Sequence, residues 1–301
     1  MSAPESFRVG ITLGDPAGIG PEVVRAALSS GSLPTIADYR VIGNAPAELA
    51  GRPSQETARA AAAALEEAAT LASRGEIDAI VTGPVNKAAL FQVGWKFPGQ
   101  TEFFADRCGI TNFGMLLTGG NLTVALVTIH IPLRDVAASL RKDEIVRVGS
   151  LLLDFLKLRG SDDDDCIAVA GLNPHAGESG RIGTEEIEII EPAVKELNGA
   201  NGNRFRGPIS PDTVFHRANK GEFAAVLCMY HDQGLIPLKL QGFHDGVNVT
   251  LGLPFPRTSP DHGTAFDIAG KSEARPDSMM AAIRLAVELL KARARKGGTK
   301  A

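Results

Sequence analysis

The sequence contains few cysteines and aromatic residues, and it has no long apolar run. Only three of its 301 residues are cysteine, and Cys108, Cys166 and Cys228 lie far apart without any CxxC spacing. Such an odd and scattered set predicts reduced thiols and indicates neither a disulfide framework nor a thiolate zinc site. No apolar stretch reaches the roughly 18 residues that a membrane span needs, and the N-terminus lacks the pattern of a signal peptide. We therefore expect a cytoplasmic protein without a membrane anchor.

An excess of positive charge is also lacking. The chain has 31 Lys and Arg against 35 Asp and Glu, which gives a net charge of −4, and no long basic stretch occurs. Nucleic-acid-binding proteins usually carry a basic patch or stripe that neutralises phosphates, so this class is not expected. Hydrophobic residues make up 44% and charged residues 22% of the chain, as in a globular enzyme. The expected ligands are small molecules.

Short β-branched runs alternate with helical patterns along the chain. A long helix is predicted over residues 55–74, where Ser54 is placed to cap its start and Gly75 to end it. Alternating strands and helices favour a mostly parallel sheet flanked by helices, and the short connection at 119–121 predicts one antiparallel hairpin within this mixed α/β fold. The predicted strands are 8–13, 40–43, 79–82, 122–128, 167–170 and 225–229, and the other predicted helices are 143–158, 184–197 and 278–294.

No linker, internal repeat or low-complexity tract marks a domain boundary. The length allows two lobes of about 150 residues each, and a central cleft is then expected. We therefore expect residues 1–301 to form two intertwined α/β lobes without a clear boundary in the sequence. The four aspartates at 162–165 precede a predicted strand and indicate a solvated loop, because four consecutive carboxylates in an extended segment cannot all face one ion.

Two segments rich in glycine and small polar residues follow predicted strands. Residues 11–22 (ITLGDPAGIGPE) join a strand to a helix, with Pro21 suited to the first helical turn. Free N–H groups at such a turn can bind an anion, although a purely structural turn explains the segment equally well. It is not the Rossmann fingerprint, because the third glycine is missing. Residues 82–87 (TGPVNK) again join a strand to a helix, and residues 97–102 (FPGQTE) predict a helix that starts near Thr101.

Three of the six histidines, His130, His175 and His231, directly follow predicted strands. A single histidine is more often a surface or core residue than a ligand. Three of them at strand ends could nevertheless converge on one cleft, because ligand sites form where strands of open α/β sheets end. Three neutral imidazoles could bind a divalent metal and leave coordination positions open for substrate oxygens. Asp232 could then support one of the ligands without contacting the metal itself.

Lys239 and Arg257 are two of the cationic residues in the C-terminal third of the chain. Lys239 and Arg257 could each bind a phosphate or carboxylate, and the guanidinium is suited to bidentate contact. Either residue alone could equally be an ordinary solvated cation.

Six motifs in order resemble those of the 4-hydroxythreonine-4-phosphate dehydrogenases, a family whose fold is similar to that of isocitrate and isopropylmalate dehydrogenases. They are GDPAGIGPE from Gly14, TGPVNK from Thr82, PGQTEFF from Pro98, NPHAGE from Asn173, YHDQGLIPLK from Tyr230, and GVNVTLGLPFPRTSPDHGTAFDIAG from Gly246. The resemblance covers almost the whole chain.

The resemblance implies a role for several residues. It implies that His130, His175 and His231 bind one divalent metal ion, either zinc, magnesium or cobalt. It further implies substrate contacts from Gln100, Thr101, Lys239, Asn248 and Arg257, NAD(P) contacts from His262, Gly263, Thr264 and Asp267, and catalytic roles for Lys239 and Asp232. Position 100 is commonly histidine in the family, so Gln100 changes the donor pattern of one substrate contact.

The implied activity is the metal-dependent oxidation of 4-phosphooxy-L-threonine at C3, with NAD or NADP as acceptor, in pyridoxal phosphate synthesis. The product is a β-keto acid, which loses carbon dioxide to give 3-amino-2-oxopropyl phosphate. The resemblance also implies an obligate homodimer whose active sites are shared between subunits. One alternative is a paralogue that oxidises 4-phosphothreonate or 4-phosphoerythronate, for which Gln100, His244 and Asp245 are the residues to compare. Another is a metal-stabilised binding protein without activity.

Overall fold

The computed structural model describes residues 6–162 and 165–297, which form two compact units. Unit 1 contains the described residues up to Thr111 together with those from Val247 onward, and unit 2 is Asn112–Gly246. The chain therefore leaves unit 1 once, builds the whole of unit 2, and then returns to complete unit 1.

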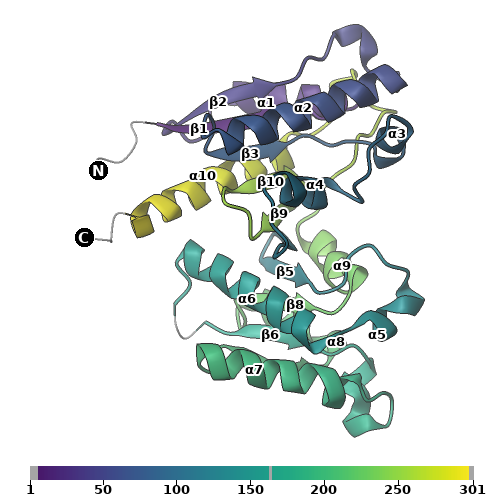
Figure 1. Cartoon of the computed structure of the whole chain (residues 1–301), viewed down its shortest axis with the longest axis vertical. Coiled ribbons are helices and arrows are strands. Elements are labelled where there is room, and N and C mark those ends of the chain that lie inside the picture. Colours follow the sequence, from purple (N-terminus) through teal and green to yellow (C-terminus); the bar gives the residue numbers. More distant parts are fainter. Residues whose placement is uncertain (1–5, 163–164, 298–301) are drawn as a thin grey trace. The chain divides into compact units, whose positions relative to one another are not determined.

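Unit 1 contains five strands in the order β2-β1-β3-β10-β9 (Figure 1). The first four of these strands are parallel, whereas β9 runs antiparallel to β10. The strand β10 thus lies between β3 and β9, although it is the last strand among the described residues. The bounds are β1 (Phe7–Thr12), β2 (Ala37–Ile42), β3 (Ala79–Thr82), β9 (Val247–Leu251) and β10 (Arg257–Pro260).

Helices cover the sheet of unit 1, with α2 packed on β1 to β3 and α10 on β1, β3, β9 and β10. The helix α2 begins as predicted. The Ser54 hydroxyl accepts a hydrogen bond from the N–H of Thr57, whose side chain accepts one from the N–H of Ser54, and Gly75 follows the helix with φ +66°. The bounds are α1 (Gly20–Ser29), α2 (Gln55–Ser73), α3 (Lys87–Gln92), α4 (Gln100–Arg107), α10 (Asp277–Gly297) and a 3-10 turn, Ala47–Leu49.

The described residues of unit 2 also form five strands, in the order β4-β5-β8-β6-β7. The predicted hairpin at 119–121 is confirmed, because β4 and β5 pair in antiparallel register on either side of it. The other neighbours are parallel. The bounds are β4 (Gly114–Gly119), β5 (Leu122–Leu126), β6 (Ile167–Ala170), β7 (Phe205–Ile209) and β8 (Ala225–Cys228).

The helices of unit 2 pack on its strands, α6 on β4, β5 and β8, and α9 on β4, β5 and β8. The helix α9 contains both Gly234 and Pro237, which normally disfavour a helix. A side chain at position 234 would have its Cβ 3.0 Å from the Cys228 sulfur, so only glycine lets α9 pack this closely. The bounds are α5 (Val136–Ser139), α6 (Lys142–Arg159), a π-helix (Glu186–Ile190), α7 (Glu191–Asn201), α8 (Pro211–Asn219) and α9 (His231–Gln241).

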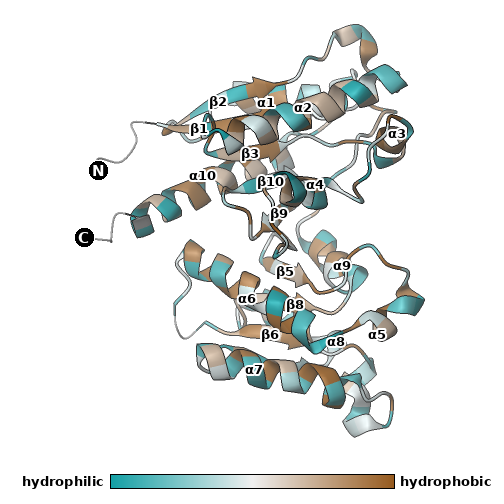
Figure 2. Ribbon diagram, in the orientation of Figure 1, coloured by the Kyte–Doolittle hydropathy of each residue, from teal (hydrophilic) through white to brown (hydrophobic). Residues whose placement is uncertain are grey.

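The predicted fold class is confirmed as α/β with a mostly parallel, mixed arrangement of strands flanked by helices. The central strands are buried along their whole length, and Figure 2 shows brown strands beside helices that mix brown and teal. Over the described part of the chain, no helix combines the length and apolarity that crossing a membrane requires. Two of the four consecutive aspartates, at 163 and 164, lie outside the described residues.

Candidate functional site

The guanidinium of Arg257 is buried in unit 1, with only 2% of the residue exposed. The pairing of the strands explains which residues lie beside it. Arg257 pairs with Thr250 on β9 and with Ile80 on β3, and Ile80 lies two residues before Thr82. Its terminal nitrogens donate to the Thr82 hydroxyl at 2.5 Å, the Thr250 hydroxyl at 3.2 Å and the Gln100 side-chain oxygen at 2.9 Å. All three acceptors are neutral.

The charge of Arg257 is therefore not matched by a hydrogen-bonded carboxylate. Burial lowers the pKa of this guanidinium to about 9, and the negative charge of Glu102 acts in the opposite direction. The side chain stays protonated at neutral pH. Its Nε has no hydrogen-bond partner among the described residues, and neither does the buried Oδ1 of Asn248. A buried cation with a spare donor beside neutral groups is suited to bind an anion such as a phosphate or carboxylate.

The other predicted substrate residues of unit 1 surround this cation. Thr101 is buried at the start of α4, and its hydroxyl is 3.2 Å from that of Thr250. Asn248 lies two residues before Thr250, so both side chains leave β9 on the same face. Gln100 accepts from Arg257 and donates to the carbonyl of Gly83 at 3.4 Å, so a neutral amide bridges the cation and the TGPVNK turn. The structure thus brings four of the five predicted substrate residues into one unit.

The glycine-rich segment at 11–22 supports another loop. The backbone N–H of Ile19 donates to the carbonyl of Thr264, and a Cβ at Gly18 would lie 2.8 Å from that oxygen. The N–H groups of Asp15, Ala17 and Gly18 also have partners within the protein. The structural interpretation of this segment is therefore favoured over anion binding, because these N–H groups are already used.

The predicted cofactor residues His262, Gly263, Thr264 and Asp267 belong to the loop that this segment supports. Thr264 is buried and is held through its carbonyl, whereas Asp267 is exposed. The backbone N–H of Gly270, at the end of the loop, donates to the Glu22 carboxylate at 3.0 Å. The loop is therefore anchored at both ends to α1 or to the turn before it.

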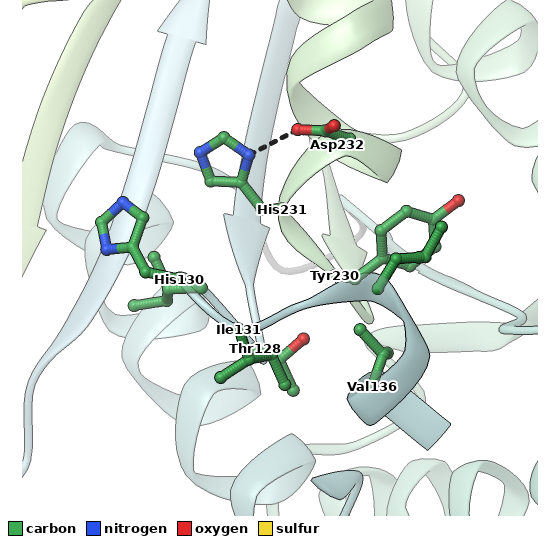
Figure 3. A pocket seen from close by; sticks show the side chains of 9 residues that line it. Thr128, His130, Ile131, Val136, Tyr230, His231 and Asp232 are labelled. Atoms are coloured by element: carbon green, nitrogen blue, oxygen red, sulfur yellow. Dashed lines mark hydrogen bonds and ion pairs between the residues drawn. The ribbon is translucent and has the colours of Figure 1, made fainter. Parts of the chain in front are cut away.

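In unit 2, His130 and His231 lie close together in a pocket of about 260 Å³ (Figure 3). Their ring centres are 5.6 Å apart, and Tyr230 and Val136 line another part of the pocket. The Asp232 carboxylate accepts a hydrogen bond from Nδ1 of His231 at 2.6 Å. In a neutral imidazole this leaves Nε2 as the nitrogen with a free lone pair, which is the form that binds a metal.

His175 is presented by an unusual turn after β6. Five consecutive residues, 175–179, have φ between 45° and 78°, so the chain makes one left-handed helical turn. Only Gly177 among them is a glycine, and left-handed helix costs roughly 1–2 kcal/mol for each other residue. Strain of this kind persists where surrounding structure enforces it, and it often occurs at functional sites. The Nδ1 atom of His175 is 4.0 Å from the Asp212 carboxylate.

Two buried side chains that the sequence analysis did not single out hold this region. Glu186, in the π-helix, accepts hydrogen bonds from the backbone N–H groups of Leu172 and Asn173, both at 2.7 Å. Gln233, in α9, accepts from the N–H of Met229 and donates to the carbonyl of Gly171, again both at 2.7 Å. Gln233 therefore joins the end of β8, which precedes His231, to the end of β6, which precedes His175.

The chemistry of these histidines fits a divalent metal, but one chain brings only two of them together. Within residues 6–162 and 165–297, no group of three or more His, Cys, Asp or Glu side chains is close enough to hold an ion. His130 and His231 share a pocket that His175 does not line. The three-histidine site therefore stays a prediction, and a complete set needs either a movement within unit 2 or a ligand from a second chain.

Lys239 lies on α9, eight residues after His231 and so about 12 Å further along a helix that rises ~1.5 Å per residue. Three large apolar side chains close to it in the sequence are exposed. Ile236 is 67%, Leu240 82% and Phe243 73% exposed. We call Ile236, Leu240 and Phe243 the α9 patch. Ile236 and Leu240 lie one helical turn apart on α9, and exposed apolar side chains that gather on one surface mark interaction sites in soluble proteins.

The fold is shared with a solved dehydrogenase structure. An isocitrate dehydrogenase of Methylococcus capsulatus superposes with a TM-score of 0.55 over 96% of this chain and 88% of its own, at 17% identity, which shows a shared fold. The chain belongs to the family described as pyridoxal phosphate biosynthetic protein PdxA, whose profile matches residues 23–286.

Relatives within this family are similar over nearly their whole length. A 4-hydroxythreonine-4-phosphate dehydrogenase of Desulforapulum autotrophicum is 42% identical, with 92% of this chain and 94% of that protein covered. A D-threonate 4-phosphate dehydrogenase of Pectobacterium atrosepticum is 40% identical, with 93% and 98% covered. A solved structure of the 4-hydroxythreonine-4-phosphate dehydrogenase of Klebsiella pneumoniae has a TM-score of 0.82 at 37% identity, with 96% and 99% covered.

Proposed function

We propose that the protein is a cytoplasmic, metal-dependent and NAD- or NADP-linked dehydrogenase that oxidises 4-phosphooxy-L-threonine at C3 in pyridoxal phosphate synthesis. The buried Arg257 carries the proposal, because a protonated guanidinium whose hydrogen-bonded partners are all neutral is suited to bind an anionic ligand. The names of the relatives support a phosphorylated substrate. Thr101, Gln100 and Asn248 would bind the polar groups around that anion.

His130, His175 and His231 would hold the metal ion, with Asp232 orienting the ring of His231. When bound, the ion would polarise the C3 hydroxyl and lower the pKa of that hydroxyl. The loop that contains His262, Gly263, Thr264 and Asp267 would position the nicotinamide cofactor, which accepts the C3 hydrogen together with two electrons. The resulting β-keto acid then loses carbon dioxide.

Lys239 has two possible roles, as acceptor of the hydroxyl proton or as a contact to the phosphate. Lys239→Met separates them. If Lys239 handles the proton, kcat should fall by about 100-fold or more with little change in KM, because general base catalysis contributes 10²–10⁴-fold. If Lys239 binds phosphate, KM should rise while kcat changes little. Steady-state kinetics measures both.

The protein is proposed to act as a homodimer with shared active sites. The α9 patch supports this, since its three apolar side chains are exposed in the single chain and a second copy would cover them. The dimer should bury on the order of 2,000 Å², as obligate pairs usually do.

Leu240→Asp should dissociate this dimer. A carboxylate buried in an apolar interface costs several kcal/mol, so the dimer dissociation constant should rise by about 100-fold or more. Analytical ultracentrifugation measures it, with Asn203→Asp as the control because it adds the same charge at an exposed turn of the same unit. A Leu240→Asp protein that remains dimeric at the wild-type dissociation constant would exclude the α9 patch as the interface.

The choice of substrate is tested by one panel. Purified protein is assayed with 4-phosphooxy-L-threonine, 4-phosphothreonate and 4-phosphoerythronate, each with NAD and with NADP and with added zinc, magnesium or cobalt. The name of the Pectobacterium relative favours 4-phosphothreonate as the second candidate. Asp245 also has a structural contact, because its carboxylate accepts from the N–H of Gly120 at the β4–β5 hairpin. No cofactor reduction with any member would favour a binding protein instead.

A further inference from the structure

We propose that Glu186 is a positioning residue that sets the direction of His175 by holding the left-handed turn at 175–179. The inference rests on the proposed function, in which His175 is a metal ligand. Glu186 lies outside the motifs that resemble the family, and it reaches the site from a π-helix that follows the turn in the sequence. Such helices are rare and occur often at functional sites.

The contacts of Glu186 are concentrated where the chain enters the turn. The residue is 1% exposed, and its Oε1 accepts the backbone N–H groups of both Leu172 and Asn173. Its Oε2 accepts from Nδ2 of Asn173 at 2.9 Å, and the same Nδ2 donates to Glu185 at 2.7 Å. One carboxylate thus holds the backbone N–H groups of Leu172 and Asn173 and the side chain of Asn173, just ahead of His175 in the chain.

The turn is shaped around this carboxylate. A Cβ at Gly177 would lie 2.7 Å from Oε2 of Glu186, and one at Gly183 would lie 2.3 Å from Nδ2 of Asn173. Glycine at these two positions lets the carboxylate and the amide approach the backbone. Because the turn is left-handed, the side chain of His175 leaves the backbone in a direction that a relaxed right-handed turn would not give.

The position of the turn relative to His231 is fixed by a separate contact. Gln233 joins the Gly171 carbonyl to the Met229 N–H, so the ends of β6 and β8 stay together whether or not Glu186 is present. Loss of the Glu186 carboxylate should therefore change the turn and the aim of His175 while leaving His231 and the pocket with His130 in place.

The test compares Co²⁺ affinity in wild type, Glu186→Gln, His175→Ala and the double variant. Affinity is measured by competition with a chelator and by the visible spectrum of the bound ion. Glutamine keeps the shape of Glu186 but presents N–H donors to the Asn173 amide. We expect Glu186→Gln to weaken Co²⁺ binding by about 10- to 100-fold, the range seen when groups supporting metal ligands are lost. His175→Ala should weaken it at least as much.

The double variant distinguishes positioning from general destabilisation. If Glu186 acts through His175, adding Glu186→Gln to His175→Ala should cause no further loss of Co²⁺ affinity, because the two changes remove one interaction. Glu188→Gln is the matched control, since it makes the same charge change at an exposed position of the same π-helix, and it should bind Co²⁺ like the wild type. Hydrogen exchange at Leu172 and Asn173 should accelerate in Glu186→Gln alone.

Three outcomes would overturn the inference. The first is a Glu186→Gln protein that binds Co²⁺ with wild-type affinity. The second is a loss of Co²⁺ affinity from Glu186→Gln that is as large in the His175→Ala background as in the wild type. Wild-type affinity in His175→Ala would reject the proposed metal role of His175 as well, so the two failures are distinguishable. If Glu186→Gln does not fold, Asn173→Ala removes the side-chain contact to Glu186, together with one to Glu185, and should give the same pattern.

Discussion

His231→Ala is expected to lose stoichiometric metal and to slow hydride transfer by about 1,000-fold or more. A bound metal ion contributes several kcal/mol to stabilising the alkoxide, and each 1.36 kcal/mol is tenfold in rate. The fold should remain, because a metal held in a cleft of a long chain need not be structural. Metal content and single-turnover hydride transfer are measured together, and chelation of the wild type should cause the same loss reversibly.

His130→Ala should behave in the same way, since its ring lies 5.6 Å from that of His231 in the same pocket. The control is His216→Ala, which replaces an exposed histidine of α8 in the same unit and should change neither metal content nor rate. A His231→Ala protein with one metal per chain and normal turnover would show that the site is elsewhere.

Arg257→Ala is expected to raise KM by about 10- to 100-fold with a smaller loss of kcat. Hydrogen bonds to charged groups contribute roughly 1.5–3 kcal/mol, and 1.4 kcal/mol is tenfold in affinity. An anion clamp binds ground state and transition state alike, so its loss affects KM more than kcat. Arg257→Lys keeps the charge but not the fork of donors, so it should recover only part of the affinity.

The control for Arg257→Ala is Arg284→Ala, an exposed arginine of the same unit that hydrogen-bonds to Ser32. Thermal melting of each variant shows whether unit 1 stays folded, since Arg257 also holds Thr82 and Thr250. An unchanged KM with a large fall in kcat would mean that Arg257 acts on the reacting atoms instead.

The predicted strands have buried β-branched or aliphatic residues, although β4 and β9, which have them too, were not predicted. The strand β3 and the strand β6 match their predicted bounds, because every residue in them is apolar or small and buried. By contrast, β10 (Arg257–Pro260) was missed, since a strand made of Arg, Thr, Ser and Pro has no hydrophobic pattern. Two of its polar side chains are buried with hydrogen bonds to groups on other segments, Arg257 to three neutral side chains and Thr258 to the carbonyl of Ala282.

The histidine pair was visible in the sequence because both residues follow apolar strands, and the resemblance pointed to the same positions. Glu186 and Gln233 gave no such signal. Their importance depends on which backbone N–H and carbonyl groups they reach, and those groups belong to other segments of the chain. A left-handed turn in four non-glycine residues is equally invisible, since their sequence favours no such conformation.

The place of β10 in unit 1 has a consequence for how the protein is made. During synthesis the first 111 residues can pair only β2, β1 and β3, so β3 is left as an unpaired edge with an apolar surface. Unit 2 emerges next, and its five described strands are contiguous in the chain, whereas unit 1 must wait for β9, β10 and α10. The N-terminal segment is therefore the part of the nascent chain most exposed to aggregation and to chaperone binding.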